Sequence, residues 1–256
     1  MEGWQGWDQY AEFYDWENAK TVGRRDIRFW QRIAKESGGP VLELGCGTGR
    51  VSLPVARTLV RLVGIDRSHA MLSQAKRRVK RAGLGGGLLL LRGDIRALPF
   101  VSSSRFRLVM APYGVLQSLL RDRELREVLT SVRDVLQPGG IFAIDLVPEL
   151  PVWREYDRRV SLRGRRGAKS QISLVESVRQ VPSRKLTIFD QEFIERRGRS
   201  RSSKRFSLAF RTLSVHQMTG RLRRAGFSVV QVAGDYRMGA WRPEAEVCLI
   251  VAKRKL

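Results

Sequence analysis

Cysteine and histidine are scarce in this sequence, whose 256 residues include two of each: Cys46, Cys248, His69 and His216. The two cysteines lie far apart, and neither belongs to a CxxC pair or a Cys/His cluster. A disulfide framework and a zinc site are therefore not expected, and no other metal site is predicted. Long apolar runs are also missing. Residues 108–116 form one of the longest, far below the roughly 20 residues that a membrane span needs, so no transmembrane helix is expected.

The first residues, MEGWQGWDQYAEFYDWE, are acidic and aromatic. A secretory signal would need a basic start and an apolar core, so the sequence favours a cytoplasmic protein. Apolar residues make up 43% of the chain and charged residues 29%, which is ordinary for a globular protein. The length suits one large α/β domain, or one such domain with an inserted subdomain.

Acidic residues are few beside the basic ones: 25 against 48, a formal net charge of +23. The excess is uneven. Residues 1–150 carry 23 basic and 16 acidic side chains, a net +7, and residues 151–256 carry 25 and 9, a net +16. A basic second part is compatible with an anionic partner such as nucleic acid, although a solvated arginine-rich surface is the more ordinary interpretation.

Short apolar segments alternate with helical patterns over the first 150 residues. After helical segments within 8–36, the expected strands are 41–44, 61–66, 88–94, 106–112 and 141–147. The intervening helices are expected at 51–60, at 68–82 with Ser68 as N-cap, and at 121–136. This alternation indicates βαβ units and a parallel sheet.

After residue 150 the pattern becomes alternating and rich in β-formers, as in 173–181, 185–196 and 203–215, with 196–203 as an exposed hairpin tip. We interpret 152–213 as antiparallel strands added to the main domain. A helix is expected over 216–227, followed by strands at 228–236 and 246–254. The predicted fold is therefore α/β: a Rossmann-like seven-stranded sheet with helices on both faces, plus an inserted antiparallel β subdomain.

The segment Glu43-Leu44-Gly45-Cys46-Gly47-Thr48-Gly49 forms a glycine-rich turn between the first strand and its helix. Glycine tolerates positive φ and lets a ligand approach the backbone. Ligands of open α/β sheets bind at the carboxyl ends of the strands, where Asp66 and Asp94 end the second and third strands. A carboxylate at the end of the second strand can accept hydrogen bonds from both ribose hydroxyls, and one after the third strand can accept from an adenine amine. Glu43 can form a charge-assisted hydrogen bond with a ligand ammonium. Together they describe a nucleoside that carries an amino acid.

The segments VLELGCGTGR (41–50), VGIDRSHAML (63–72), RGDIRALPF (92–100) and LQPGGIFAIDLV (136–147) resemble the class I S-adenosylmethionine-dependent methyltransferases. The resemblance is strong over about 40–150. It implies S-adenosylmethionine as cofactor, S-adenosylhomocysteine as product, and roles for particular residues. Gly45, Gly47, Gly49 and Ala111 would lie beside the methionine portion, Asp66 would hold the ribose, and Asp94, Ile95 and Met71 would contact the adenine. Glu43, Cys46 and Arg67 complete the implied cofactor set, with Tyr10 and Tyr14, and less strongly Trp30, covering the cofactor from the N-terminal helices.

A dinucleotide-dependent dehydrogenase is the rival enzyme class. Its turn has the pattern G-x-G-x-x-G/A, whereas position 50 here holds Arg, and Glu43 would repel a pyrophosphate. This rival is therefore set aside.

The methyl acceptor is less well marked. Ala111-Pro112-Tyr113-Gly114 follows the fourth strand, where methyltransferases of nucleobase and glutamine amino groups often carry a carboxamide or carboxylate. Ala111 supplies neither, which argues against those substrates. Tyr14 and His216 are weak candidates for a catalytic base, and His69 is interpreted as a surface residue. The candidate acceptor contacts are Tyr10, Tyr113, Gln117, Trp153, Tyr156, Phe210 and Arg211.

The predicted organisation has three parts: N-terminal helices over 1–37, a methyltransferase domain over 38–151 and 214–256, and a β lid over 152–213. The resemblance implies transfer of a methyl group to N or O of a small molecule, with the lid over the acceptor and often in a dimer contact. One alternative is an RNA or protein methyltransferase that docks through its basic β insert. Another is a module that binds the cofactor without catalysis. No membrane partner is expected.

Overall fold

The structure is a computed structural model that describes residues 7–21, 23, 25–84, 86–100, 105–147, 154–167 and 170–256. Its helices are α1 (Trp7–Lys20), α2 (Ile27–Ser37), α3 (Ser52–Ala56), α4 (His69–Ala82), α5 (Asp122–Val135) and α6 (Val215–Arg224), with short 3₁₀ turns η1 (Val115–Ser118) and η3 (Pro182–Arg184). No helix among these residues is long and apolar enough to cross a membrane.

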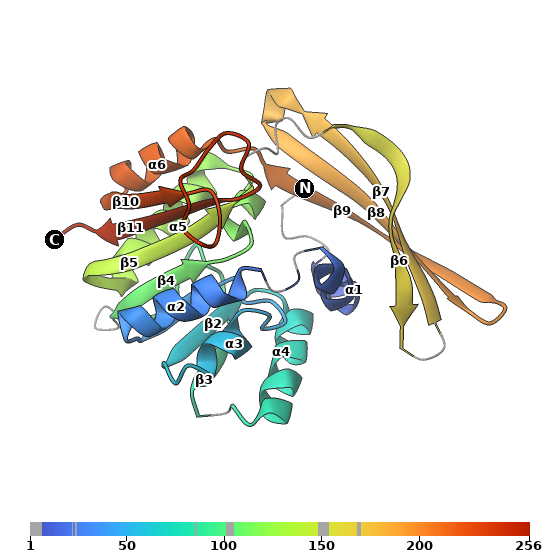
Figure 1. The fold of residues 1–256 in the computed structure, drawn as a ribbon, viewed down its shortest axis with the longest axis horizontal. Coiled ribbons are helices and arrows are strands. Elements are labelled where there is room, and N and C mark those ends of the chain that lie inside the picture. The colour runs from blue at the N-terminus through green and yellow to red at the C-terminus, as the bar shows by residue number, and fades with distance from the viewer. Residues whose placement is uncertain are drawn as a thin grey trace.

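Seven strands form the main sheet in the order β10-β11-β5-β4-β1-β2-β3 (Figure 1). They are β1 (Val41–Leu44), β2 (Leu62–Asp66), β3 (Leu88–Arg92), β4 (Phe106–Ala111), β5 (Leu136–Leu146), β10 (Phe227–Ala233) and β11 (Cys248–Arg254). Strands β1 to β5 run parallel, and β11 is antiparallel to both its neighbours. The strand order reverses between β1 and β4, which is where α/β sheets of this kind bind ligands.

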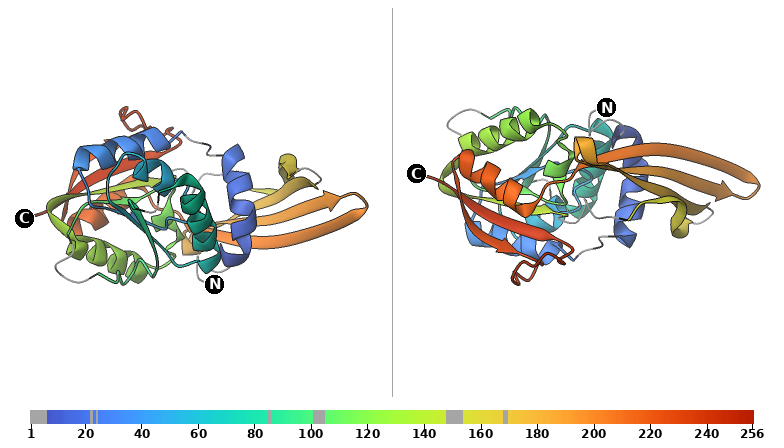
Figure 2. Two further views of the ribbon diagram at one scale, coloured as in Figure 1. Left: turned by 90° about the horizontal axis from the view of Figure 1, so that it is seen from below. Right: turned by 90° about the horizontal axis from the view of Figure 1, so that it is seen from above.

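Helices cover both faces of this sheet, as the Rossmann-like prediction requires (Figure 2). Alternate strand residues point to opposite faces, so Leu42 packs with α5 and α6 whereas its neighbour Val41 packs with α2 to α4. Both residues are buried, because the central strands lie between two apolar layers. The predicted fold class is confirmed.

A second sheet, antiparallel and four-stranded, joins β6 (Tyr156–Arg166), β7 (Ser170–Val181), β8 (Leu186–Arg197) and β9 (Ser200–Arg211) in sequence order. It follows β5 and precedes α6, and it extends away from the main domain (Figures 1 and 2). The hairpin tip expected over 196–203 is shorter in the structure: Gly198 and Arg199 form it, and the rest of that range belongs to β8 and β9. Strand β6 was not singled out in the sequence, because its basic residues hide the alternation. The domain boundaries proposed above stay predictions.

Helix α1 lies between the main domain and the second sheet. On one side the side-chain amide of Gln74, in α4, donates to the Ala11 carbonyl (2.7 Å). On the other side Phe13 stacks on Phe193 of β8, with ring centroids 4.4 Å apart. The helix therefore packs one face against each part of the protein.

Helix α4 begins where its sequence signal lies. The Ser68 hydroxyl accepts a hydrogen bond from the Met71 amide (3.1 Å), which confirms the predicted N-cap. This start places the end of β2 and the first turn of α4 next to the glycine-rich turn.

Candidate functional site

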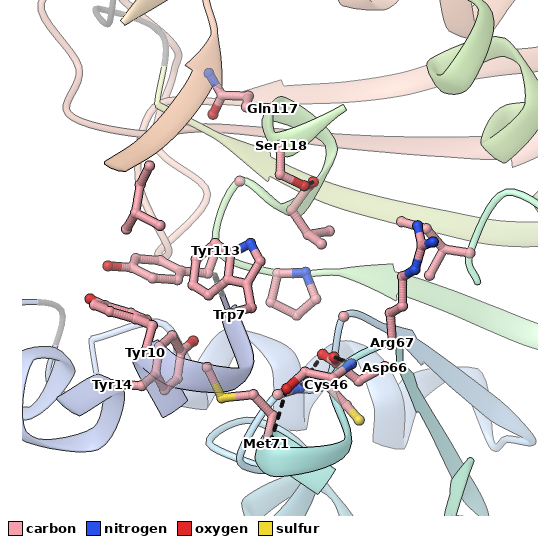
Figure 3. A pocket seen from close by; sticks show the side chains of 18 of the residues that line it. Trp7, Tyr10, Tyr14, Cys46, Asp66, Arg67, Met71, Tyr113, Gln117 and Ser118 are labelled. Carbon is pink, nitrogen blue, oxygen red and sulfur yellow. Dashed lines mark hydrogen bonds between the residues drawn. The ribbon is translucent and has the colours of Figure 1, made fainter. Parts of the chain in front are cut away.

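A cavity of about 600 Å³ lies at the carboxyl ends of the parallel strands. The segments after β1, β2, β3 and β4 form one wall, and α1 and the second sheet form the other. Figure 3 shows Tyr10 and Tyr14 on one side, Cys46, Asp66 and Met71 at the base, and Gln117 and Ser118 opposite. The volume falls in the usual range for small-molecule sites.

Among the residues predicted for the site, those that line this cavity are Tyr10, Tyr14, Glu43, Gly45, Cys46, Gly47, Asp66, Arg67, Met71, Asp94, Ile95, Tyr113, Gln117 and Phe210. Those that do not line it are Gly49, Ala111, Tyr156, Arg211 and His216. Trp153 lies outside the described residues.

Two glycines of the turn are required for different structural reasons. Gly45 and Gly47 both have positive φ, +63° and +54°. A Cβ on Gly45 would lie 2.5 Å from Cγ2 of Val115, so that position has no room for a side chain. A Cβ on Gly47 would meet only Tyr14 Cε1, at 3.9 Å, and the Gly45 carbonyl oxygen, at 4.0 Å. Gly47 therefore leaves open a strip of cavity beneath the Tyr14 ring.

Gly49 was expected beside the methionine portion of the cofactor, and the structure corrects this. Its φ is +80°, and a Cβ would lie 2.3 Å from Cδ1 of Leu53. Gly49 permits α3 to pack closely on the turn and does not line the cavity. Ala111 also departs from the expectation, because it is fully buried in the core beneath the loop that follows β4.

Asp66 ends β2 with its carboxylate beside the turn. One oxygen accepts from the Gly47 amide and the other from the Ser68 amide, both at 2.8 Å. Each carboxylate oxygen can accept further hydrogen bonds, so Asp66 can hold the turn and still bind ligand hydroxyls. Burial raises its pKa above the ordinary value, although the two amides oppose that shift. A ligand that donates hydrogen bonds here would stabilise the charged form.

Asp94 lies after β3 and is already engaged by arginines. The Arg96 side chain donates to both of its oxygens, the shortest contact being 2.8 Å, and Arg67 lies 3.4 Å away. Burial acts to raise the pKa of Asp94, but these arginines outweigh burial and lower it. Asp94 is thus a fixed carboxylate next to Ile95, and an amine would share it with Arg96.

Glu43 lies at the floor of the cavity and is 2% exposed. The Ser52 hydroxyl donates to its Oε2 at 2.6 Å. Burial raises the pKa of Glu43 to about 8, while Ser52 and the nearby Arg50 oppose the shift. Burial also raises the pKa of the neighbouring Cys46 thiol. A positively charged ligand group near Glu43 would favour its ionised form.

The stability of the ligand-free protein should report the protonation of Glu43. The folded protein keeps this proton up to about pH 8, whereas the unfolded chain loses it near the ordinary pKa of 4.5. Between these values the folded state binds more protons, so rising pH lowers the free energy of unfolding. We expect Glu43→Gln to reduce the loss of stability between pH 5 and pH 8 by about 1 kcal/mol or more, measured by urea unfolding at both pH values.

Exposed Glu244 supplies a matched control, because Glu244→Gln changes the charge at the surface and away from the cavity. That variant should lose stability between the two pH values as the unmodified protein does. If Glu43→Gln loses as much stability between the two pH values as the unmodified protein and Glu244→Gln, Glu43 is ionised in the folded protein.

The cavity face of α1 carries Tyr10, Tyr14 and Glu17, at spacings of four and three residues. Tyr10 also packs edge-on against Phe206 of β9, with centroids 5.4 Å apart. Burial raises the pKa of the Tyr14 hydroxyl well above its ordinary value. Tyr14 therefore keeps its proton near neutral pH and can donate a hydrogen bond, which argues against its role as a base. Trp30 is fully buried in the core and covers no ligand space.

His216, the other candidate base, lies in the first turn of α6, is exposed, and does not line the cavity. This position rules out contact with a ligand in the cavity and corrects the hypothesis. His69 is exposed at the start of α4, as expected.

Three of the predicted acceptor contacts have structural partners. Arg211 is buried and forms an ion pair with Asp122 at 2.5 Å. Tyr156 lies behind the cavity wall and donates to Glu176, which does line the cavity. Gln117 lines the cavity, but its amide accepts from the Val147 amide (2.9 Å) and donates to the Val147 carbonyl (3.0 Å). Gln117 therefore fixes the chain at the end of β5.

Sequence reasoning missed several charged and polar cavity residues, among them Arg50, Glu17 and Gln191. Arg50 forms a bidentate pair with Asp26, with both distances 2.7 Å, beneath the ring of Tyr113. Glu17 could have been found, because it continues the helical spacing of Tyr10 and Tyr14. Nothing local marks Gln191, since its partner Glu17 is 174 residues away. Among the described residues, no group of three or more His, Cys, Asp or Glu side chains is arranged to hold a metal ion.

Comparisons with known proteins agree with this geometry. The family model described as "Methyltransferase domain" matches residues 41–140, from β1 into β5. A demethylmenaquinone methyltransferase of Parafrankia sp. is 32% identical over 205 residues, which cover 68% of this chain and 78% of that protein. A sterol 24-C-methyltransferase of Eremothecium gossypii is 28% identical over 144 residues, or 56% of this chain and 37% of that protein.

A solved structure of similar fold is the sugar N-methyltransferase KedS8 from Streptoalloteichus sp.. Its TM-score is 0.76 at 15% identity, with 95% of this chain and 93% of that chain covered. The chain belongs to the class I S-adenosylmethionine-dependent methyltransferases. It spans little more than a third of the length of the sterol methyltransferases that it matches.

Proposed function

We propose that this protein transfers a methyl group from S-adenosylmethionine to a nitrogen or oxygen of a small molecule. One observation carries the proposal: a single cavity joins the glycine-rich turn and Asp66 to the face of the second sheet at Phe189 and Phe210. The cofactor and the acceptor can therefore share one space. A solved protein of similar fold is a sugar N-methyltransferase, which supports a small-molecule acceptor.

The residues present suit the cofactor. Gly47 leaves open the strip that a side chain would fill, Asp66 can accept from two hydroxyls, and Asp94 with Ile95 offers an acceptor and an apolar contact. Glu43 keeps its proton in the ligand-free protein, and a positively charged ligand group near the turn would favour its ionised form. When bound, S-adenosylmethionine supplies a methyl group on a positively charged sulfur that leaves as a neutral thioether.

The chain's own contribution is then alignment and exclusion of water. Tyr10, Tyr14 and Trp7 of α1 cover the cavity from the side opposite the turn (Figure 3). Holding the two reactants in line within a closed cavity supplies much of the rate of such a displacement. In this proposal α1 and the second sheet together hold the acceptor, and the homodimer that the resemblance implies stays a prediction.

Incubating the protein with S-adenosylmethionine and mixtures of small amines and alcohols should release S-adenosylhomocysteine, detected by mass spectrometry. Calorimetric titration with S-adenosylmethionine alone should show binding without any acceptor. A protein that binds the cofactor but transfers no methyl group to any mixture would favour the non-catalytic module. A protein that binds no cofactor would contradict the proposal itself.

An RNA or protein acceptor would have to dock on the basic second sheet. Several of these cations already have partners within the fold: Glu12 pairs with Arg166 and Lys204, and Glu192 pairs with Arg158 and Arg205. This internal pairing favours the small-molecule acceptor. Docking on RNA would weaken steeply as salt rises, which titration of an RNA oligomer at two salt concentrations would reveal.

A further inference from the structure

Two carboxylates meet across the part of the cavity that lies between α1 and the second sheet. Glu17 comes from α1, and Glu176 comes from β7, directly opposite Gln191 of β8 in the strand register. The Gln191 amide nitrogen donates to Glu17 Oε1 at 3.1 Å and to Glu176 Oε2 at 2.8 Å. All three side chains line the cavity. A single amide therefore holds two carboxylates at one place.

Several acceptor atoms at this place have no partner. Glu17 Oε2, Gln191 Oε1 and Asn18 Oδ1 are buried and accept no hydrogen bond. Gln191 is only 4% exposed and Asn18 only 3%. Rotating either amide would not help, because the Gln191 nitrogen is needed by two carboxylates and the Asn18 nitrogen donates to the Tyr14 carbonyl (2.8 Å). Unsatisfied buried acceptors are costly, so a ligand that donates hydrogen bonds is favoured here.

The unpartnered atoms are all of one kind. Among the described residues that line the cavity, every buried side-chain polar atom without a partner is an acceptor. Neither Glu17 nor Glu176 forms an ion pair with a Lys or Arg side chain of the described residues. An alcohol brings one donor and no charge. An alkylammonium brings up to three donors and a positive charge, so it satisfies this arrangement better.

The surroundings also make Glu17 able to exchange a proton near neutral pH. Burial raises the pKa of Glu17 to about 7, the charge of Glu176 adds to the shift, and the hydrogen bond from Gln191 opposes it. Tyr113 faces Glu17 from the loop after β4, and burial raises the pKa of its hydroxyl to about 12. Tyr156 donates to Glu176 from behind. Glu17 can therefore take up a proton near neutral pH.

We propose that the methyl acceptor is a primary or secondary amine, that Glu17 and Glu176 bind it as an ammonium ion, and that Glu17 removes the proton that blocks its lone pair. This inference rests on the proposed methyl transfer and names its acceptor class. An N–H bond breaks, an O–H bond forms at Glu17 Oε2, and the electron pair stays on nitrogen. Ammonium and carboxylate become a neutral amine and a neutral acid. Glu17 returns the proton to solvent after product release.

Matched pairs of ligands test the binding part of this proposal. The probes are glucosamine and glucose, cyclohexylamine and cyclohexanol, and benzylamine and benzyl alcohol, each added to the protein saturated with S-adenosylhomocysteine. We expect at least one amine to bind about tenfold or more tighter than its alcohol, by calorimetry and by the rise in Tm. In Glu17→Gln this preference should disappear, and in Glu176→Gln it should decrease.

Glu12→Gln is the matched control, because Glu12 lies on the same helix, pairs with Arg166 and Lys204, and does not line the cavity. It should keep the full preference for amines. Glutamine at position 17 can still accept from Gln191, so the Glu17→Gln protein should unfold near the normal Tm. Absence of any amine preference in the unmodified protein, or its persistence in Glu17→Gln, overturns the proposal.

Kinetics test the proton transfer. With the preferred amine, Glu17→Gln should lower kcat about 10²-fold or more, in the range measured for general bases, and raising the pH should partly restore the rate. A variant that binds the amine weakly but keeps its kcat would overturn the role of Glu17 as base. Failure to bind S-adenosylhomocysteine would instead count against the proposed function, so the two failures are distinguishable.

Discussion

Asp66→Ala is expected to weaken binding of S-adenosylmethionine about 10²–10³-fold, measured by calorimetry. Asp66 offers a charged acceptor to two ribose hydroxyls, and hydrogen bonds to charged groups contribute roughly 1.5–3 kcal/mol each. The carboxylate also accepts the amides of Gly47 and Ser68, so its removal loosens the turn that carries the methionine portion. Both effects act in the same direction on affinity.

Asp235 offers a control, because its carboxylate also accepts two backbone amides of a turn. Its Oδ1 accepts the Arg237 amide at 2.8 Å and the Gly239 amide at 2.9 Å, in a turn that does not line the cavity. Asp235→Ala should therefore lose turn stability as Asp66→Ala does and still bind S-adenosylmethionine normally. The same titrations are made with S-adenosylhomocysteine. If Asp66→Ala binds both ligands with normal affinity, the cofactor does not lie against β2.

The sequence alone could predict the parts of this site whose signals are local. The turn 45–49, Asp66 and Asp94 each follow a short apolar strand, and a parallel sheet gathers such strand ends at one edge. The second sheet could also be predicted, because its strands alternate between apolar and polar residues. Strand β6 was harder to identify, since most of its residues are exposed and its sequence is basic.

The remainder depends on contacts between residues distant in sequence. Glu17 and Gln191 come together only because α1 packs between two parts of the chain, and no periodicity encodes that packing. The contacts of Asp94 and Gly49 could not be predicted for a different reason. Arg96 and Leu53, which decide what those residues can contact, are close in sequence, but only the folded backbone shows where their side chains point.

Charge in the cavity is arranged in two separate groups. Near the glycine-rich turn, the three arginines Arg50, Arg67 and Arg96 pair with Asp26, Asp94 and Glu124. Between α1 and the second sheet, Glu17 and Glu176 have an amide between them and no matching cation among the described residues. The arginines near the turn are thus already paired within the fold, whereas the part between α1 and the second sheet gains most from a cationic ligand.

Arg50→Met should destabilise the protein by about 3–5 kcal/mol, measured by urea unfolding. Arg50 makes two hydrogen bonds of 2.7 Å to Asp26, whose side chain is fully buried. Among the described residues, removing the guanidinium leaves that buried carboxylate with one side-chain donor, the Trp30 indole nitrogen 3.2 Å away. Leaving a buried charge unpaired lowers the free energy of unfolding far more than losing a solvated ion pair does.

The double variant Arg50→Met with Asp26→Asn tests this cause, because it removes the orphaned charge. It should be more stable than Arg50→Met alone, so the two substitutions should be strongly non-additive. Arg123→Met is the control, since Arg123 pairs with Glu127 at 2.7 Å on the exposed face of α5 and should cost no more than about 0.5 kcal/mol. Additive effects of the two buried substitutions would show that Arg50 and Asp26 are not energetically coupled, and Arg50 would then be free to move toward a bound ligand.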